Sequence, residues 1–463
     1  MSAMQSLLEQ QDQFFNSGAT RALEYRLAAL ARLKAALQAH EAGFIDALKT
    51  DLGKGAVEAY GTEIALVYDE IDFIRARLGG WLRPRRVPTP LLHFPAVSHR
   101  TLEPLGRVLI MAPWNYPYQL LLLPLVGALA AGNTVVLKPS ELAPATAARV
   151  EAVLGEAFAP QQLAVVNGGV ETAQALLDES WDHIFFTGGT AVGKLVMKAA
   201  AEHLTPVTLE LGGKSPVIVD ATADMALAVK RIAWGKLFNA GQTCIAPDYV
   251  LVQRTLYEAL LAGLEDAFTH MAGRDPLRNP DYPQIISQRH FERLCRMINP
   301  AQVAYGGQSD PAARRIAPTL LSGVTPDDAV MGEEIFGPLL PVLAYDTLDE
   351  ALTVVARQPN PLALYLFTRD RGVEQRVMQG VRFGGGCVND VVSQVYNPHL
   401  PFGGRNASGL GNYHGLNSVL TFSHSKSILK KGLWLDLAFR YPPYRLSLGL
   451  LKALFKIGSK AVW

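Results

Sequence analysis

Short apolar segments alternate with helical patterns through the first half of the chain. The segments that are apolar throughout predict buried strands, and they lie at 106–113, 134–140, 163–169, 183–189 and 206–213. Apolar residues recur at helical spacing between them, at 118–131, 146–158, 172–177 and 191–202. Five strands that alternate with helices indicate a parallel, doubly wound α/β sheet.

A second α/β stretch follows this first one. Its strand-like segments lie at 215–220, 249–253 and 339–345, and its helical patterns lie at 224–238, 255–272 and near 288–298. The chain before the first strand differs, because residues 18–50 predict one helix with leucines at helical spacing. Residues 79–106 are interrupted by Gly79, Gly80 and five prolines, which predicts an extended excursion with an edge hairpin.

The composition is that of a globular protein without a strong charge. The 463 residues suggest about two to four domains, and 49% are hydrophobic against 18% charged. With 43 basic and 42 acidic side chains the net charge is +1, which argues against a nucleic-acid partner. Three cysteines exclude a disulfide framework and show no zinc spacing. The chain shows neither a signal-peptide pattern nor a long apolar segment, so we expect a cytoplasmic protein without a metal site.

The sharpest candidate for chemistry is the segment FNAGQTCIAP at 238–247. It places Cys244 after a glycine and small polar residues, which predicts a loop. A cysteine thiolate is a strong nucleophile toward carbonyl carbon. The alternative for Cys244 taken alone is an inert buried residue, and we interpret Cys295 and Cys387 as inert.

Two further segments supply a carboxylate and an amide. Glu210 ends the strand of LELGGKSP, and a carboxylate at the carboxyl end of a parallel strand faces the crevice where ligands bind. Partial burial would raise its pKa, as a general base requires. Asn115 in APWNYP follows a strand end, where a fixed amide can donate to an oxyanion. The alternatives are a structural carboxylate for Glu210 and an Asx-type turn for Asn115.

Three segments have features of a nucleotide site. FTGGTAVGK joins a strand to a helix at 186–194, and backbone amides at the helix start could hold a phosphate, although a plain tight turn is an equal alternative. VLKPSE closes a strand with Lys138 and places Glu141 where an acid commonly binds the adenosine ribose, unless both are surface charges. EEIFGP, at 333–338, places two acids before an aromatic residue and a Gly-Pro turn.

Together these segments resemble the aldehyde dehydrogenase superfamily. PWN, KPSE, FTGGTAVG, ELGGK, GQTC and EEIFGP occur in that family's order, and six motifs in order are highly specific. The position of Cys244 and the segment at 400–429 resemble the class 3 branch, which contains fatty and aromatic aldehyde dehydrogenases that are typically homodimers. The resemblance implies an α/β fold of two doubly wound parallel-sheet domains with a small β excursion for oligomerisation.

We expect four parts along the chain. They are a NAD(P)-binding Rossmann-like domain (1–81 and 107–211), a catalytic domain (212–400), a bridging and oligomerisation segment (82–106 and 401–430), and a basic amphipathic tail (431–463).

The resemblance also implies the chemistry. Cys244 would attack an aldehyde, Asn115 and the backbone N–H of Cys244 would bind the oxyanion, and Glu210 would activate water to hydrolyse the resulting thioester. The substrates expected from the branch are medium- or long-chain aliphatic or aromatic aldehydes. The alternatives are a dehydrogenase that transfers the acyl group to coenzyme A, a thiol hydrolase, and an idle binding protein on the same fold. Glu210 argues against the first of these.

The residues implied for the cofactor are Lys138 and Glu141 at the adenosine ribose, Gly188 and Gly193 at the pyrophosphate, and Glu334 with Phe336 at the nicotinamide ribose. Glu141 can accept both ribose hydroxyls of NAD and would repel a 2′-phosphate, whereas Lys138 would offset part of that repulsion. We therefore expect NAD, with NADP as the alternative.

The end of the chain is basic and amphipathic. Residues 426–463 carry eight basic side chains against one acid. Apolar residues at helical spacing predict a helix over 446–463, and they are Leu446, Leu450, Leu454, Ile457 and Ala461. We expect this helix beside the substrate entrance or peripherally at the inner face of a membrane. Packing on the body or on a partner subunit is an equal alternative.

Overall fold

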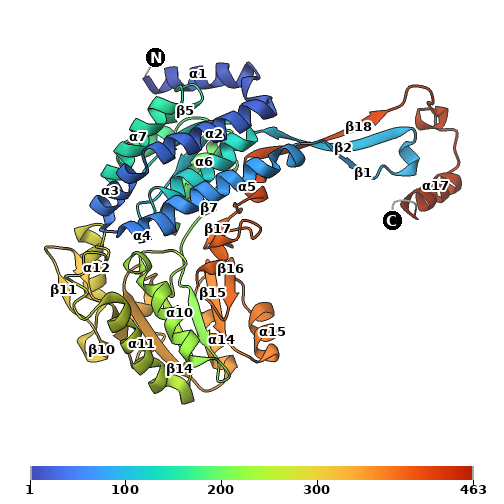
Figure 1. The fold of residues 1–463 in the computed structure, drawn as a ribbon. Coiled ribbons are helices and arrows are strands. Elements are labelled where there is room, and N and C mark those ends of the chain that lie inside the picture. The colour runs from blue at the N-terminus through green and yellow to red at the C-terminus, as the bar shows by residue number, and fades with distance from the viewer. Residues whose placement is uncertain (1–2, 461–463) are drawn as a thin grey trace.

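Two sheets of mostly parallel strands form the two halves of the body, and helices cover both of them (Figure 1). The computed structural model describes residues 3–460 of the chain. A narrow antiparallel arm projects from the body and carries the C-terminal segment near its outer end (Figure 1). This arrangement confirms the predicted fold class.

The first sheet contains all five strands predicted for this part of the chain: β3 (Arg107–Met111), β4 (Thr134–Lys138), β5 (Leu163–Val165), β6 (His183–Thr187) and β7 (Val207–Glu210). Its order is β17-β7-β6-β3-β4-β5. The five predicted strands are parallel, and β17 (Gly409–Leu410) pairs antiparallel with β7 at one edge. A parallel sheet brings the carboxyl ends of its strands to one edge, so the residues after β3, β4, β6 and β7 lie on the same side.

The helices between these strands also match the predicted pattern. They are α6 (Gln119–Ala131), α7 (Pro144–Ala157), α8 (Val170–Leu177) and α9 (Thr190–Glu202). Every residue of α6 is buried, because this helix lies against β3 and β4 and is covered by N-terminal helices. A helix that is apolar all round is typical of such a position.

The prediction of one helix over 18–50 is wrong. The N-terminal region instead forms α1 (Ala3–Asn16), α2 (Leu23–Ala39), α3 (Glu41–Leu52), α4 (Ala56–Ala59), a π turn (Tyr60–Ile64) and α5 (Ala65–Trp81). The helix breaks at His40, whose φ is −116°. On the two sides of the break, α2 packs against α5, α6 and α7, whereas α3 packs against α7 and α4.

The second sheet has the order β10-β13-β14-β9-β8-β15-β16. Its predicted elements are β8 (Pro216–Val219), β9 (Tyr249–Gln253), β14 (Leu339–Tyr345), α10 (Met225–Leu237), α11 (Tyr257–Ala272) and α12 (Gln288–Met297). Elements that the pattern did not predict are β10 (Val303–Tyr305), β13 (Thr319–Leu321), β15 (Ala363–Phe367), β16 (Gly385–Val388), α13 (Ala329–Gly332), α14 (Leu348–Ala356) and α15 (Arg371–Gly380). A small hairpin pairs β11 (Ser309–Asp310) with β12 (Arg315–Ile316).

The arm confirms the predicted excursion and adds a strand to it. β1 (Arg85–Val87) and β2 (Ala96–Pro104) are antiparallel, and β18 (Ser423–Lys431) pairs with β2 along its whole length. The short helix α16 (Leu416–Thr421) packs on α6 just before β18. Except for β17, every strand of the two large sheets lies in the range predicted for its domain. The exact limits of the domains stay a prediction.

The C-terminal segment forms a helix, α17 (Leu448–Lys460), within the predicted range, but it begins after Leu446, which the sequence predicts on its apolar face. It packs near the 3₁₀ turn Leu91–His93 at the outer end of the arm, away from the body of its own chain (Figure 1). Ala461, which belongs to the predicted apolar face, lies outside the described residues. Among residues 3–460, none of the helices has the length and apolar character needed to span a bilayer.

Candidate active site

A cavity of about 380 Å³ lies between the two halves of the body. Six of the nine predicted site residues line it: Asn115, Gly188, Glu210, Cys244, Glu334 and Phe336. They come from loops at the carboxyl ends of strands in the first sheet and from two loops of the second half. The fold therefore brings together residues that are up to about 220 positions apart in the sequence.

A second, smaller cavity of about 40 Å³ meets the first one at Cys244. The two cavities share Leu120, Cys244, Phe402 and Tyr413. Apolar and aromatic side chains line most of the smaller cavity, among them Leu66, Tyr116, Phe238, Val392, Val395 and Tyr396. The Cys244 thiol therefore borders one large polar-edged space and one apolar space.

The loop that carries Cys244 has an unusual backbone. Asn239, Ala240 and Gly241 have φ values of 48°, 49° and 73°, so three consecutive residues are left-handed. A Cβ atom at Gly241 would lie 2.1 Å from the backbone oxygen of Gly337, which only glycine avoids. Left-handed conformations at ordinary residues cost free energy and persist where the surroundings impose them, which is typical of functional sites.

Burial raises the pKa of the Cys244 thiol well above its usual value. The carboxyl groups of Glu334 and Glu210 act in the same direction, because a negative charge opposes a thiolate. The backbone N–H groups of Cys244 and Ile245 act in the opposite direction. The resting cysteine is therefore a neutral thiol, and it must lose its proton before it can act as a nucleophile.

Glu210 ends β7, and its side chain is only 2% exposed. Neither carboxyl oxygen has a hydrogen-bond partner among the described residues. Burial therefore raises the pKa of Glu210 well above its usual value. A carboxylate with a raised pKa is a stronger base than an ordinary glutamate.

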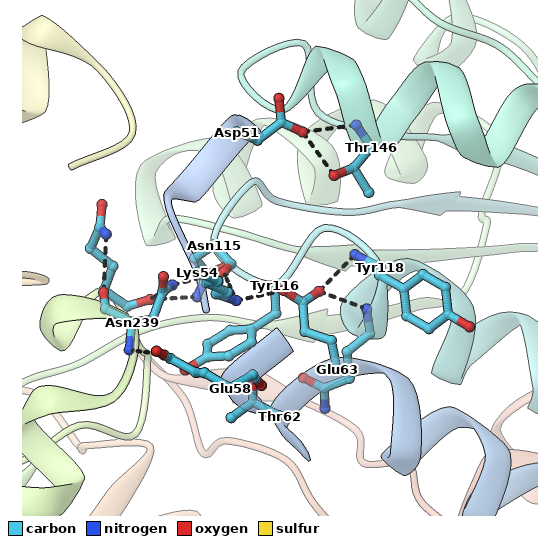
Figure 2. Close-up of polar contacts among 12 residues, drawn as sticks. Asp51, Lys54, Glu58, Thr62, Glu63, Asn115, Tyr116, Tyr118, Thr146 and Asn239 are labelled. Carbon is cyan, nitrogen blue, oxygen red and sulfur yellow. Dashed lines mark hydrogen bonds and ion pairs between the residues drawn. The ribbon is translucent and has the colours of Figure 1, made fainter. Parts of the chain in front are cut away.

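Asn115 is buried between the first sheet and the Cys244 loop (Figure 2). Its side-chain nitrogen donates to the backbone oxygen of Gln242 at 3.1 Å. Its backbone oxygen accepts from the Asn239 side chain at 2.8 Å and from Lys54 at 3.1 Å. The Asn115 amide is thus tied to the loop that carries Cys244, and one of its two N–H bonds remains for a ligand.

Glu334 lies on a loop held by buried charges. The Lys214 ammonium bonds to Asp248 at 2.5 Å and to the backbone oxygen of Glu333 at 2.8 Å. Asp248 in turn accepts from the backbone N–H of Ile335 at 2.9 Å. Burial, followed by the nearby Asp248, raises the pKa of Glu334 to about 8.

Phe336 belongs to the same loop and has a φ of 51°. Its ring meets Trp114 edge-on, with centroids 5.4 Å apart. Arg293, which also lines the large cavity, donates to the backbone oxygens of Glu334 and Ile335 at 3.2 and 2.6 Å. Sequence reasoning missed Lys214, Asp248 and Arg293. Lys214 ends the ELGGK motif and could have been found, whereas the other two have no local signal.

The remaining predicted residues lie near the carboxyl edge of the first sheet. Gly189 is the N-cap residue of α9 and, having no side chain, leaves the helix start without a side-chain cap. It lines the cavity beside Gly188, although the sequence did not assign it to the cofactor site. Gly193 lies in the first turn of α9, where a Cβ atom would approach Leu211 to 2.6 Å, so this glycine brings the helix close to the sheet. The first N–H groups of a helix have no partner within that helix, and Gly188 and Gly189 line the cavity next to the start of α9.

Lys138 ends β4, Glu141 follows it, and both lie outside the lining of the large cavity. Their side chains form an ion pair of 2.8 Å, in which Lys138 is buried and Glu141 is partly exposed. Partial burial alone would raise the pKa of Glu141, but the Lys138 ammonium lowers it below its usual value. Glu141 is therefore negative at neutral pH. The described residues contain no group of three or more His, Cys, Asp and Glu residues that could hold a metal ion.

The fold and the site together define a class, an α/β oxidoreductase in which a buried thiol and a buried carboxyl group face a cavity at the edge of a dinucleotide-type sheet. The chain belongs to the aldehyde dehydrogenase family, whose family model matches residues 3–428. It is 46% identical over 445 residues to the 4,4'-diaponeurosporen-aldehyde dehydrogenase of Staphylococcus aureus, a match that covers 96% of this chain and 97% of the relative.

Two further comparisons support the branch. The mouse aldehyde dehydrogenase family 3 member A2 is 43% identical over 433 residues, with 93% of this chain and 90% of the relative covered. The structure of the substrate-bound state of Staphylococcus aureus AldH superposes with a TM-score of 0.96 at 44% identity, covering 98% of this chain and 100% of that one. The resemblance to the class 3 branch is confirmed.

A solved structure also bears on the cofactor. An indole-3-acetaldehyde dehydrogenase in complex with NAD+ superposes with a TM-score of 0.85 at 29% identity, covering 92% of this chain and 88% of that one. The protein is accordingly an aldehyde dehydrogenase whose fold accommodates a nicotinamide dinucleotide.

Proposed function

We propose that the protein oxidises aldehydes to carboxylic acids with NAD, through a thiohemiacetal and then a thioester on Cys244. The observation that carries this proposal is the meeting of two cavities at the Cys244 thiol, with the unpaired Glu210 carboxyl group lining the larger one. An aldehyde can reach the sulfur from the apolar side while a cofactor and water occupy the other side.

The first chemical step is addition of the Cys244 sulfur to the aldehyde carbon. The carbonyl oxygen becomes an oxyanion, and the side-chain amide of Asn115 and the backbone N–H of Cys244 are the donors proposed to bind it. The thiol proton passes to water in the cavity and from there to solvent, which leaves the Glu210 carboxylate for the later hydrolysis.

The cofactor site fits the residues present. The uncapped start of α9 beside Gly188 and Gly189 offers N–H groups to a pyrophosphate, and Glu334 reaches the cavity from the opposite loop. Bound there, the nicotinamide ring supplies the hydride acceptor for oxidation of the aldehyde carbon. Glu141 binds the adenosine ribose and, as a carboxylate, repels a 2′-phosphate. Because Lys138 is already paired with Glu141, we propose a preference for NAD over NADP.

Hydrolysis of the thioester is the step in which Glu210 acts. Its carboxylate has free acceptor positions, so it can take a proton from water while that water attacks the thioester carbon. Transfer of the acyl group to coenzyme A would not require such a base. We therefore propose a hydrolytic enzyme.

The substrate class is proposed from the residues that line the apolar cavity and from the relatives. Their aromatic and aliphatic side chains suit aldehydes with an apolar group, either medium- or long-chain aliphatic or aromatic, and the cavity of about 40 Å³ must widen to take such a group. The relatives named for 4,4'-diaponeurosporen-aldehyde and indole-3-acetaldehyde support this choice. The antiparallel arm, with its exposed three-stranded sheet, is the surface that we propose for a homodimer.

Cys244→Ser tests the proposal. We expect this variant to lose NADH formation, measured by absorbance, while NAD binding measured by calorimetry is retained. Cys295→Ser is the matched control, because Cys295 lies on α12 outside the lining of both cavities. Substantial turnover by the Cys244 variant would reject the nucleophile, and a requirement for added coenzyme A would reject hydrolysis.

A further inference from the structure

A fully buried ion pair lies directly behind the Asn115 loop (Figure 2). The side chains of Lys54 and Glu63 are both 0% exposed, and their charged atoms are 2.5 Å apart. The second carboxyl oxygen of Glu63 accepts the backbone N–H groups of Tyr118 and Gln119 at 2.9 and 3.3 Å. Glu63 therefore satisfies two N–H groups at the start of α6, which have no partner within that helix.

Lys54 has a second contact, and it reaches the site. Its ammonium donates to the backbone oxygen of Asn115 at 3.1 Å and lies 3.9 Å from the centre of the Tyr116 ring. The same Asn115 oxygen accepts the side chain of Asn239 at 2.8 Å. The Asn115 peptide is thus held by one donor from the loop between α3 and α4 and one from the loop that carries Cys244.

Other contacts join the same three segments. The Glu58 carboxyl group, in α4, accepts the backbone N–H of Asn239 at 2.7 Å. The Tyr116 hydroxyl and the Thr243 hydroxyl are 2.6 Å apart. The left-handed backbone of the Cys244 loop is therefore held by Glu58 of α4 and by direct contacts with the Asn115 loop.

A buried ion pair at this place calls for a reason other than stability. Removal of two charges from water is costly, and apolar side chains of similar volume often stabilise a protein equally well. An apolar pair could not donate a hydrogen bond to the Asn115 carbonyl, as the Lys54 ammonium does. The direction of the Lys54 hydrogen bond helps to fix the plane of the peptide after Asn115 and, with it, the orientation of the Asn115 side-chain amide.

We propose that Lys54 and Glu63 are positioning residues that orient the Asn115 amide toward the oxyanion formed at Cys244. The inference rests on the proposed function, because it needs Asn115 as an oxyanion donor. Glu63 fixes the Lys54 ammonium and the start of α6, and Lys54 fixes the Asn115 carbonyl. Neither residue touches the reacting atoms, and both act through Asn115. Displacement of a catalytic donor by about 1 Å can cost up to about 10²-fold in rate.

The decisive variant replaces both charges at once, as Lys54→Met with Glu63→Gln. Methionine retains most of the side-chain length, and the glutamine oxygen can still accept the N–H groups of Tyr118 and Gln119, so no charge is left buried alone. We expect the rate of the first NADH burst to fall about 10- to 100-fold, with the dissociation constant for NAD unchanged.

Lys34→Met with Asp72→Asn is the matched control. This lysine–aspartate pair joins α2 to α5 in the same N-terminal region but lies nearer the surface. The control should leave the burst rate unchanged.

A mutant cycle with Asn115→Ala separates positioning from a structural role. Asn115→Ala alone should slow the burst about 10²- to 10³-fold, and the double change at 54 and 63 should then add little to that loss. An equal further loss in the Asn115→Ala background would overturn the proposal, since the pair would act by another route. An unchanged burst in the pair variant with a slow Asn115→Ala enzyme would also overturn it. A full burst with Asn115→Ala would instead reject the oxyanion role in the proposed function.

A second variant is available if the pair variant does not fold, as judged by thermal melting. Glu63→Gln alone then replaces it in the same mutant cycle, with an expected fall of a few-fold in the burst rate.

Discussion

Two buried glutamates show how partners, rather than burial, decide what a carboxyl group does in this protein. Glu63 binds the Lys54 ammonium and two backbone N–H groups, whereas Glu210 has no partner for either oxygen among the described residues. The first holds backbone in place. The second retains free acceptor positions and a raised pKa, as proton transfer requires.

The surroundings of the two residues explain this difference. Glu63 lies in the π turn between α4 and α5, and π turns are often found at functional sites. There it faces the start of α6, where unpaired N–H groups need an acceptor. Glu210 lies at the end of β7, and its side chain faces the cavity shared with Cys244. A position in front of a cavity allows a water molecule to reach the carboxyl group, and a position inside the packed core does not.

The largest effect should come from Glu210→Gln. We expect steady-state turnover to fall about 10²- to 10⁴-fold, because the thioester then lacks the base that activates water. A single burst of NADH should still form when the enzyme is mixed with aldehyde and NAD, because Glu210 acts only after hydride transfer. The melting temperature should not fall, because no partner of Glu210 is lost. Full steady-state turnover without a burst would show that Glu210 is structural.

Lys54→Ala should act mainly on stability. It leaves the Glu63 carboxylate buried without its counter-ion, so we expect a loss of about 3–5 kcal/mol in the free energy of unfolding. Chemical denaturation with intrinsic fluorescence would measure this loss. If Lys54→Ala and Glu210→Gln changed the unfolding free energy equally, the contrast between the two glutamates would be wrong.

The pH dependence should reflect the unpaired carboxyl group. The pKa of Glu210 and the pKa of Cys244 are both raised, and both groups act in the deprotonated form. Turnover should therefore increase as the pH rises from about 6 to about 9. The residual turnover of Glu210→Gln should lose the part of this increase that belongs to Glu210. Turnover that falls over the same range would contradict the assignment of Glu210 as a base.

The smallest effect on the reaction should come from deletion of 446–463. α17 exposes Leu448, Leu450 and Phe455 at the outer end of the arm and carries Lys452 and Lys456. We predict that the full chain sediments with anionic vesicles at low salt, that high salt weakens this binding, and that the truncated chain does not bind. Turnover of short aldehydes should not change. Equal vesicle binding by both chains, with unchanged kinetics on long-chain aldehydes, would leave only a packing role for this helix.

Much of the fold could be predicted because its signals are local. The strands β3 to β9 lie in short apolar segments, and in the helices between them apolar residues recur every three to four positions. β16 escaped prediction because its sequence, GGCV, looks like a turn, and it forms a strand only beside β15. The break at His40 was not predicted either. The leucine spacing continues on both sides of it, and α2 and α3 differ only in the elements against which they pack.

The sequence by itself determined which residues could do chemistry. Cys244 in a glycine-bounded loop, Glu210 at a strand end and Asn115 after a strand are recognisable from their neighbours and from the order of the motifs. The tertiary structure decided which of these groups are paired and which are not. Lys54 and Asn115 are 61 positions apart, and Lys214 and Asp248 are 34 apart, so no local pattern shows their contacts. Protonation is decided in the same way, because the pKa of a buried carboxyl group depends on the water excluded and the donors supplied by segments that meet only after folding.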